Sequence, residues 1–414
     1  MAFKNLNMIN YFKKSIMPVK NGMMEKYAEM RYESTHRDFN IIHDKEQPLR
    51  LNLIVPTIES KDVFGGVSTA LKIFINLYQN LECEARIITM NSFKEMTDAV
   101  PDSFKDIQNK SFIIETVDIQ DSNISLRKND IFMVTFWSTA LIAEKLIYAQ
   151  LNKYRIIDPI LVYLIQDFEP GFYPWSTEYV EAERTYHFPF KTLAVFNSKE
   201  LKIFFENNNY SFFEQTYFSP VLNDSLKKRI DMLDHLSIRK KKQILIYGRP
   251  QEYRNAYTLI IDALKKFSYL IPECEAKEWE IISLGAKHKN ITFHNGLELK
   301  SYGKVSLEDY SKIMLSSFAG ISLMISPHPS YPPLEMSTHG VKTITNSFSN
   351  KDLSNFNEFI VSLDTIGSMD IANKLFEIVN NYNDGNVTLD LNEKYISNNL
   401  EFDNLTKYIS EIIS

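Results

Sequence analysis

The sequence predicts an α/β protein with two domains, each built on a parallel sheet that helices cover. At 414 residues the chain is too long for one ordinary hydrophobic core, so two domains of roughly 200 residues each are expected. Forty-four per cent of the residues are apolar, which is enough to fill two cores. From residue 51 onward, short apolar runs alternate with stretches of helical periodicity, an order that is typical of parallel sheets.

The first half of the chain contains five apolar runs that we interpret as buried strands. They are residues 51–55, 85–90, 130–136, 160–165 and 192–196. Residues 67–81 repeat apolar side chains at intervals of three and four, which predicts a helix. Asn197 is the expected start of another helix, because Glu200 follows three positions later and such pairs cap helices.

A polar and strongly charged stretch at 221–242 interrupts this alternation and suits a connection between domains. The alternation then resumes, with strands expected at 243–247, 280–286, 320–326 and 342–346. Helices are expected from about Tyr257, after Ser306, near Leu334 and over 369–382. Ser306 is followed three positions later by Asp309, and this pairing also caps helix starts.

These elements divide the chain into four expected parts. They are a helical N-terminal extension over 1–50, Rossmann-like domains over 51–222 and 223–394, and a tail over 395–414 that returns to the first domain. Ligands of such sheets bind beyond the carboxyl ends of the strands. We therefore expect the two parallel sheets to face a cleft that holds the functional site.

Composition excludes several classes of protein. A formal net charge of −6 argues against a protein that coats nucleic acid. Cys83 and Cys274 lie far apart and form no metal or redox spacing, which favours a reducing cytoplasm. No apolar run approaches the roughly 18 residues that cross a bilayer, and the first residues lack the apolar core of a signal peptide. We expect a cytoplasmic protein.

Residues 1–24 allow two interpretations. They contain four lysines and no acidic residue, with apolar side chains between the lysines. A basic amphipathic segment of this kind can lie on an anionic membrane surface, which would place the protein at the inner face of the membrane. The alternative is a helix that packs on the protein itself or on a second subunit, as in a homodimer.

Four features fall where the predicted topology places loops at the carboxyl ends of strands. Gly65 and Gly66 precede a helix, so their backbone amides and the helix N-terminus could face a phosphate, although such a pair is also common in tight turns. Arg249 and Arg254 follow the strand at 243–247. Two guanidinium groups suit a diphosphate, because arginine binds phosphate oxygens at two points; as isolated residues both would be surface charges.

The other two features carry carboxylates. Glu335 opens a short helix after the strand at 320–326 and could accept both hydroxyls of a ribose, or simply stabilise the helix dipole. Asp167 and Glu169 follow the strand at 160–165 and precede the aromatic residues Phe172, Tyr173 and Trp175. Acids beside aromatic rings are typical of sugar binding, whereas an aromatic loop that only packs is the alternative.

The segments GGV, YGRPQEYRN, YGKVS and PPLEMSTHG, in this order, resemble the retaining glycosyltransferases of family 4, which have the GT-B fold. The resemblance covers about residues 51–380. It implies a phosphate-loop role for Gly66, a diphosphate grip for Arg249 and Arg254, and a ribose ligand in Glu335. It also implies that Gly303, Lys304 and Val305 present backbone to the nucleotide base. The first domain would then bind the acceptor, and the second the nucleotide sugar.

Within this family, YLIQDFEPGFYPWSTEYVEAERTY is similar to a rhamnosyltransferase that assembles bacterial surface-layer (S-layer) glycans. The resemblance therefore implies dTDP-β-L-rhamnose as the donor and a glycan or lipid-linked glycan as the acceptor, with no cofactor. It also implies that a donor phosphate takes the acceptor proton. Asp167 and Glu169, at the end of the strand at 160–165, are the carboxylates that we expect nearest the acceptor. No two aspartates are separated by one residue, so the D-x-D metal motif is missing and a metal-independent reaction is expected.

One departure affects the donor sugar. The family has a glutamate eight residues before Glu335, beside the transferred sugar, and Pro327 stands there. We expect His328, or the backbone at Ser330 and Tyr331, to replace it. Two other functions stay open on the sequence: a transferase that uses a UDP- or GDP-sugar, and a sugar-binding scaffold that has lost catalysis.

Overall fold

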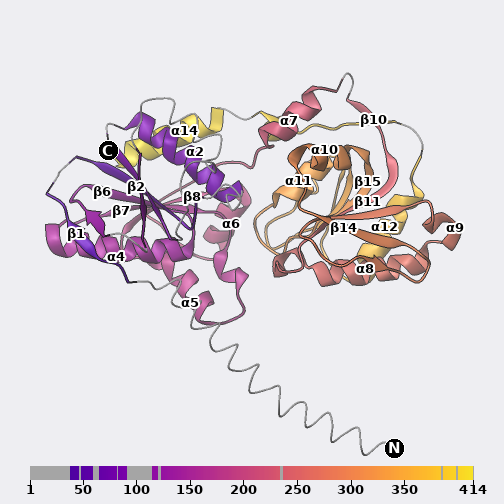
Figure 1. The fold of residues 1–414 in the computed structure, drawn as a ribbon, viewed down its shortest axis with the longest axis horizontal. Coiled ribbons are helices and arrows are strands. Elements are labelled where there is room, and N and C mark those ends of the chain that lie inside the picture. Colours follow the sequence, from indigo (N-terminus) through magenta and orange to yellow (C-terminus); the bar gives the residue numbers. More distant parts are fainter. Residues whose placement is uncertain are drawn as a thin grey trace, which may run out of the picture. The chain divides into compact units, whose positions relative to one another are not determined.

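The computed structural model describes residues 38–45, 48–58, 65–81, 83–90, 114–119, 123–233, 236–383, 386–397 and 400–413 (Figure 1). Two seven-stranded sheets dominate these residues, and each has helices on its faces. The chain separates into two compact units, residues up to Tyr163 and residues from Leu164 onward. The expectation of an α/β fold with parallel, Rossmann-like sheets is confirmed.

The first sheet has the strand order β4-β3-β2-β6-β7-β8-β9. Its strands are β2 (Arg50–Val55), β3 (Glu84–Thr89), β4 (Ile114–Asp118), β6 (Asp130–Val134), β7 (Ile160–Ile165), β8 (Lys191–Phe196) and β9 (Glu214–Tyr217). β2 pairs in parallel with both β3 and β6, as alternation with helices predicts. β1 (Ile41–His43) and β5 (Ile124–Leu126) pair in parallel and form a separate two-stranded sheet.

Helices follow these strands, and two of them, at 65–80 and 199–207, lie close to the predicted positions. The helices are α2 (Gly65–Asn80), α4 (Trp137–Tyr154), α5 (Thr177–Arg184) and α6 (Lys199–Asn207), with 3-10 turns η1 (Glu169–Phe172) and η2 (Thr185–His187). The cap of α6 is Ser198, whose hydroxyl accepts from the amide of Leu201 at 3.0 Å, and not Asn197 as the sequence suggested. Ser198 takes this place because its side chain reaches the third helical amide.

The second sheet has the order β13-β14-β12-β11-β15-β16-β17 and is parallel except for β13. Its strands are β11 (Lys241–Gly248), β12 (Glu280–Gly285), β13 (Ile291–Thr292), β14 (Glu298–Gly303), β15 (Ser317–Ile321), β16 (Lys342–Asn346) and β17 (Ile360–Leu363). β15 (Ser317–Ile321) ends earlier than the expected residue 326. Residues 322–326 follow it outside any strand.

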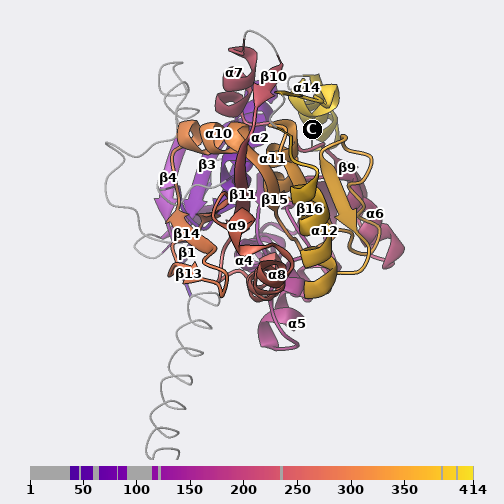
Figure 2. The ribbon, with the colours of Figure 1, turned by 90° about the vertical axis from the view of Figure 1, so that its right-hand side faces the viewer.

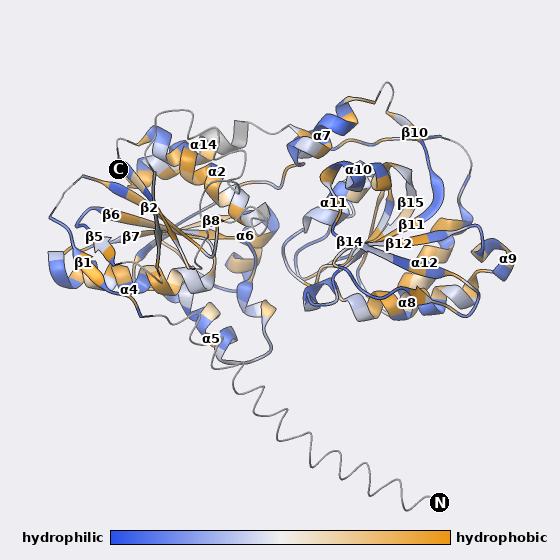
Figure 3. Cartoon of the chain, viewed as in Figure 1, coloured by the Kyte–Doolittle hydropathy of each residue, from blue (hydrophilic) through white to orange (hydrophobic). Residues whose placement is uncertain are grey.

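Alternating side chains of this sheet build a core on each face. Ile244 and Ile246 of β11 pack with α8 (Tyr257–Leu270) and α12 (Ser368–Asn380), which lie beside each other (Figure 2). Leu245, between them in sequence, packs on the opposite face with α7 (Asp224–Asp231), α10 (Leu307–Ser316) and α11 (Tyr331–Thr338). Figure 3 shows residues with hydrophobic colours along much of α8, while the short α9 (Glu273–Ala276) includes two glutamates. A one-residue slip would exchange these two faces, so burial fixes the register.

The ends of the chain differ in part from expectation. Most of the helical extension expected over 1–50, including the lysine-rich residues 1–24, lies outside the described residues, and Ile41–His43 within it is a strand because it pairs with β5. The charged connection at 221–242 contains α7 and the strand β10 (Ser237–Arg239), which pairs with β18 (Asn386–Thr388). After α13 (Glu393–Ile396), Tyr408 of α14 (Leu400–Ile413) donates to Glu214 of β9 at 2.9 Å. Across the part of the chain described here, no helix combines the length and apolar character that a membrane crossing needs.

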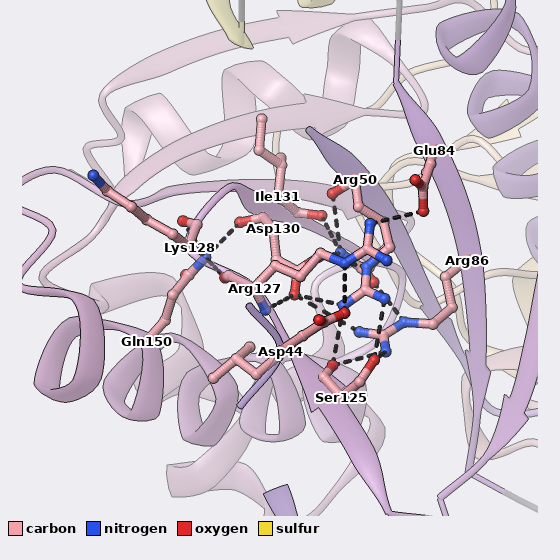
Figure 4. A network of polar contacts seen from close by, with 12 residues as sticks. Asp44, Arg50, Glu84, Arg86, Ser125, Arg127, Lys128, Asp130, Ile131 and Gln150 are labelled. Carbon is pink, nitrogen blue, oxygen red and sulfur yellow. Dashed lines mark hydrogen bonds and ion pairs between the residues drawn. The ribbon is translucent and has the colours of Figure 1, made fainter. Parts of the chain in front are cut away.

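A buried ion network joins the amino ends of the strands in the first unit (Figure 4). Arg50 donates to both carboxylate oxygens of Asp130, at 2.7 and 2.9 Å. Arg86 donates to Asn52 at 2.7 Å and to the carbonyl oxygen of Ser125 at 2.8 Å. The side chains of Arg50, Arg86 and Asp130 are 2 % exposed or less, so Asp130 is the internal counter-ion of both arginines.

The network continues to the surface through Arg127. Its amide donates to Asp130 at 2.7 Å, and its guanidinium donates to Asp44 at 2.9 Å and Glu84 at 2.7 Å. Gln150 of α4 donates to the carbonyl oxygens of Arg127, Lys128 and Asp130 and so ties the helix to the loop before β6. Hydrogen bonds and ion pairs therefore connect the amino ends of β2, β3 and β6 with each other and with α4.

Replacing Asp130 should destabilise the first unit strongly. Asp130→Asn leaves Arg50 and Arg86 buried without a counter-ion, and breaking a buried pair in this way costs about 3–5 kcal/mol of unfolding free energy. Urea unfolding at pH 7 measures the change. Asp38→Asn is the matched control, because Asp38 is fully exposed and its pair with Lys145 is long, at 3.4 Å. Equal midpoints for the two variants would contradict the role given to Asp130.

Candidate nucleotide-sugar site

The candidate site lies at the carboxyl edge of the second sheet. β11, β12, β14, β15 and β16 are parallel, so the segments that follow them emerge at the same edge. This edge is where open α/β sheets bind ligands. It carries Arg249, Arg254, Ser330 and Glu335, together with residues 303–305. The structure therefore brings together all the site residues that the sequence placed in the second half.

Arg249 directly follows β11 and reaches solvent. Its guanidinium donates to Glu252 at 3.1 Å, and both side chains are about two-fifths exposed. Gly285, at the end of β12, has a φ of +113°, and a Cβ there would approach Arg249 Cγ to 3.0 Å and the carbonyl oxygen of Gly248 to 2.9 Å. A glycine at this position thus lets the stem of Arg249 cross the end of the neighbouring strand.

Arg254 is more enclosed than Arg249. It belongs to the 3-10 turn η3 (Tyr253–Asn255), and its guanidinium pairs with the carboxylate of Asp167. The guanidinium carbon also lies 3.8 Å from the centre of the Phe172 ring, a cation–π contact. Its backbone carbonyl accepts from the amide of Ile325 at 2.8 Å, which joins η3 to the segment after β15.

Asp167, in the segment after β7, is buried and accepts several hydrogen bonds. Its carboxylate accepts from Arg254, from the hydroxyl of Ser326 and from the amide of Phe168 at 2.8 Å. Lys351 lies buried nearby and donates to the carbonyl oxygen of Met324 at 2.7 Å. Burial lowers the pKa of Lys351 to about 8, although the charge of Asp167 acts in the opposite direction. The carboxylate of Asp167 therefore interacts with two cationic side chains, Arg254 and Lys351.

The segment between Ser326 and α11 is held by its own side chains. The hydroxyl of Ser326 accepts from the amide of His328 at 3.0 Å, and Nδ1 of His328 accepts from the amide of Ser330 at 3.0 Å. Ser330 has a φ of +71°, which non-glycine residues seldom adopt. Burial lowers the pKa of His328 to about 4, so this imidazole is neutral near pH 7.

Glu335 of α11 lies among tyrosines. Its charge raises the pKa of Tyr247, Tyr310, Tyr331 and Tyr395 alike, with burial as the larger cause in each case. Burial raises the pKa of Glu335 itself to about 7, against the opposite effect of the Tyr310 hydroxyl. Glu335 is therefore close to half ionised at neutral pH, and a ligand with hydrogen-bond donors would favour the ionised form.

Residues 303–305 lie at the carboxyl end of β14, on the same edge of the second sheet. Gly303 ends β14 with a φ of +75°, where a Cβ would lie 3.2 Å from that of Lys287. Lys304 is exposed and Val305 packs against the hydrophobic cluster that contains Leu284. The role of this segment toward the nucleotide base stays a prediction.

The phosphate-loop role of Gly65 and Gly66 stays a prediction. Both residues begin α2, but residues 59–64, which connect β2 to α2, lie outside the described part of the chain. The sequence did not single out Ser326 or Lys351. A serine and a lysine carry no signal until the fold buries them beside Asp167. Within the described ranges no group of three or more His, Cys, Asp or Glu could hold a metal ion.

Solved structures with this fold share little sequence with the chain. HepE of Anabaena, solved in complex with UDP-glucose, superposes with a TM-score of 0.51 at 11% identity, covering 88% of this chain and 95% of HepE. WaaG, a glycosyltransferase involved in lipopolysaccharide biosynthesis, gives 0.50 at 9% identity, over 88% and 99%. The α,α-trehalose-phosphate synthase of Burkholderia xenovorans gives 0.50 at 9% identity, over 89% and 100%. The two sheets thus form the GT-B fold of glycosyltransferases.

Family models identify the chain more closely. Residues 50–199 match the N-terminal domain of WsaF, and residues 242–376 match its C-terminal domain. The chain belongs to the WsaF family and is a GT-B glycosyltransferase. It is also 27% identical over 223 residues to the O-antigen biosynthesis protein RfbC of Myxococcus xanthus, a match that covers 52% of this chain but 15% of RfbC.

Proposed function

We propose that this chain is a retaining transferase that moves rhamnose from dTDP-β-L-rhamnose to a glycan or lipid-linked glycan. The observation that carries the proposal is the joint placement of Arg249, Arg254 and Glu335 at one sheet edge, in a chain whose two halves match WsaF. The names of RfbC and WaaG, which refer to O-antigen and lipopolysaccharide biosynthesis, support a glycan acceptor.

The two arginines have different parts in the proposed reaction. Charge grows on the leaving diphosphate as the glycosidic bond breaks, and fixed cations stabilise that charge. Arg249 can turn toward a diphosphate at little cost, because its ion pair with Glu252 is exposed to solvent and therefore weak. Arg254 is held by Asp167, so a diphosphate must compete with that carboxylate for the guanidinium. Asp167 then positions Arg254, and a donor phosphate oxygen takes the acceptor proton.

Glu335 would recognise the nucleoside. An ionised carboxylate offers acceptor oxygens to a hydroxyl, which suits the one free hydroxyl of the deoxyribose in dTDP. The turn at 303–305 would present its backbone to the base, and Ser330 and Tyr331 would present theirs to the donor. Gly65 and Gly66, with the N-terminus of α2, would meet the donor phosphates.

The donor is tested by measuring turnover with dTDP-, UDP- and GDP-sugars and by product analysis. We expect dTDP-rhamnose to be used, with retention, and the rate to survive excess chelator. Preference for a UDP- or GDP-sugar would change the donor. A rate that chelator abolishes and magnesium restores would overturn metal independence. Failure of every nucleoside diphosphate to raise the melting temperature would favour a sugar-binding scaffold.

Arg249→Ala should lower turnover at saturating donor by about 10²–10³-fold, the usual loss when a group that stabilises transition-state charge is removed. Steady-state kinetics measure it. The matched control is Arg229→Ala, because Arg229 is similarly exposed and pairs with Glu308 on α10. If the two variants lose activity equally, Arg249 is a surface charge and its assignment to the diphosphate fails.

The affinity for dTDP should increase with pH through Glu335. The pKa of Glu335 is about 7 without ligand. A hydrogen bond from the deoxyribose hydroxyl of dTDP favours the ionised form. Affinity should therefore be about tenfold higher at pH 8 than at pH 6 from this group alone. Titration calorimetry with wild type and Glu335→Gln separates this effect from ionisation of the phosphates, because the variant keeps only the latter. Identical pH profiles would remove Glu335 from the nucleotide site.

A further inference from the structure

Among the residues that the structure describes, the side chain of His328 has a buried nitrogen atom with no hydrogen-bond partner. Its side chain lies in the segment after β15, and the residue is 6% exposed. Nδ1 accepts from the amide of Ser330 at 3.0 Å. An imidazole nitrogen that accepts cannot carry the proton, so in the neutral ring the proton lies on Nε2. Nε2 has no hydrogen-bond partner among the residues that the structure describes.

The ring is neutral under ordinary conditions. Burial lowers the pKa of His328 to about 4, and the charges of Lys351 and Arg254 act in the same direction, whereas Asp167 opposes them. Protonation of Nδ1 would also break its bond with Ser330. The Nε2–H group is therefore a neutral donor of fixed tautomer.

The backbone around His328 leaves little freedom for rearrangement. Pro327 and Pro329 flank it and have no amide hydrogen, and the amides of His328 and Ser330 are both satisfied within the segment. The hydroxyl of Ser326 ties the same segment to Asp167. Buried donors are almost always paired, so a rigidly held donor without an acceptor among the described residues leaves one hydrogen bond to be made by another molecule.

We propose that His328 binds the transferred sugar, by donating Nε2–H to one of its hydroxyl oxygens. The inference rests on the proposed function and deepens it, because it names the residue that contacts the sugar in place of the carboxylate missing at Pro327. A hydroxyl oxygen suits a neutral donor, whereas a diphosphate needs the cations that Arg249 and Arg254 supply at the same edge. Asp167 links the segment of His328, through Ser326, to Arg254, the guanidinium that the proposed function assigns to the diphosphate.

Two substitutions separate the two nitrogen atoms of the ring. His328→Asn keeps an acceptor close to the position of Nδ1, and so keeps the bond to Ser330, but removes the distal donor. His328→Gln keeps an amide donor near the position of Nε2 and loses the acceptor for Ser330. The first tests contact with the sugar, and the second tests whether the imidazole only holds the segment.

The experiment measures the affinity of dTDP, and the kcat/KM of dTDP-rhamnose, for wild type and both variants. We expect His328→Asn to bind dTDP within about twofold of wild type and to lose about tenfold or more in kcat/KM, the value of one hydrogen bond of roughly 1.4 kcal/mol. His328→Gln should recover most of that loss while its melting temperature falls.

Three other results would overturn the inference. Wild-type kcat/KM in His328→Asn would reduce His328 to a residue that holds the segment, and would leave the proposed function intact. An equal loss of dTDP affinity and kcat/KM would place Nε2 on the nucleotide. Absence of turnover by the wild type with every nucleotide sugar would overturn the proposed function and this inference together.

Discussion

The second unit depends on one buried carboxylate. Asp167 pairs with Arg254, accepts from Ser326 and attracts the buried ammonium of Lys351, so three segments of the sheet edge meet at a single side chain. Removing one partner of such a cluster leaves uncompensated buried charge, which costs far more than the cluster contributes as a whole. The positions of Arg254 and of the segment that carries His328 are therefore coupled. A ligand that draws Arg254 away must also change the surroundings of Asp167.

Much of this architecture could be predicted from the sequence because it follows from periodicity. The runs at 160–165 and 342–346 are strands with those bounds, and Ser306 caps α10 through the amide of Asp309. The carboxyl ends of parallel strands share one edge, so the order of elements alone placed Arg249, Arg254 and Glu335 together. Short strands such as β13 and β17 were not predicted, since two to four residues show no clear alternation.

The details of the site could not be predicted, for a physical reason. Asp167 and Arg254 are 87 positions apart, and a pair at that separation exists only after the fold forms. The nitrogen of His328 that carries the proton depends on whether Ser330 turns its amide toward Nδ1, which a φ of +71° permits and no residue pattern indicates. The pKa of Glu335 is likewise raised by burial, against the opposite effect of the Tyr310 hydroxyl, and this burial exists only in the folded chain.

The ion network around Asp130 has a consequence for how this family can diversify. Its charged residues begin β2, β3 and β6, at the edge of the first sheet away from the carboxyl ends of those strands. A sheet fastened at one edge tolerates insertions and exchanges at the other, because the register no longer depends on them. Segments beyond Val55, Thr89 and Val134 can therefore be replaced while the scaffold persists. Grafting such segments between relatives should succeed where Arg50 and Asp130 are both kept.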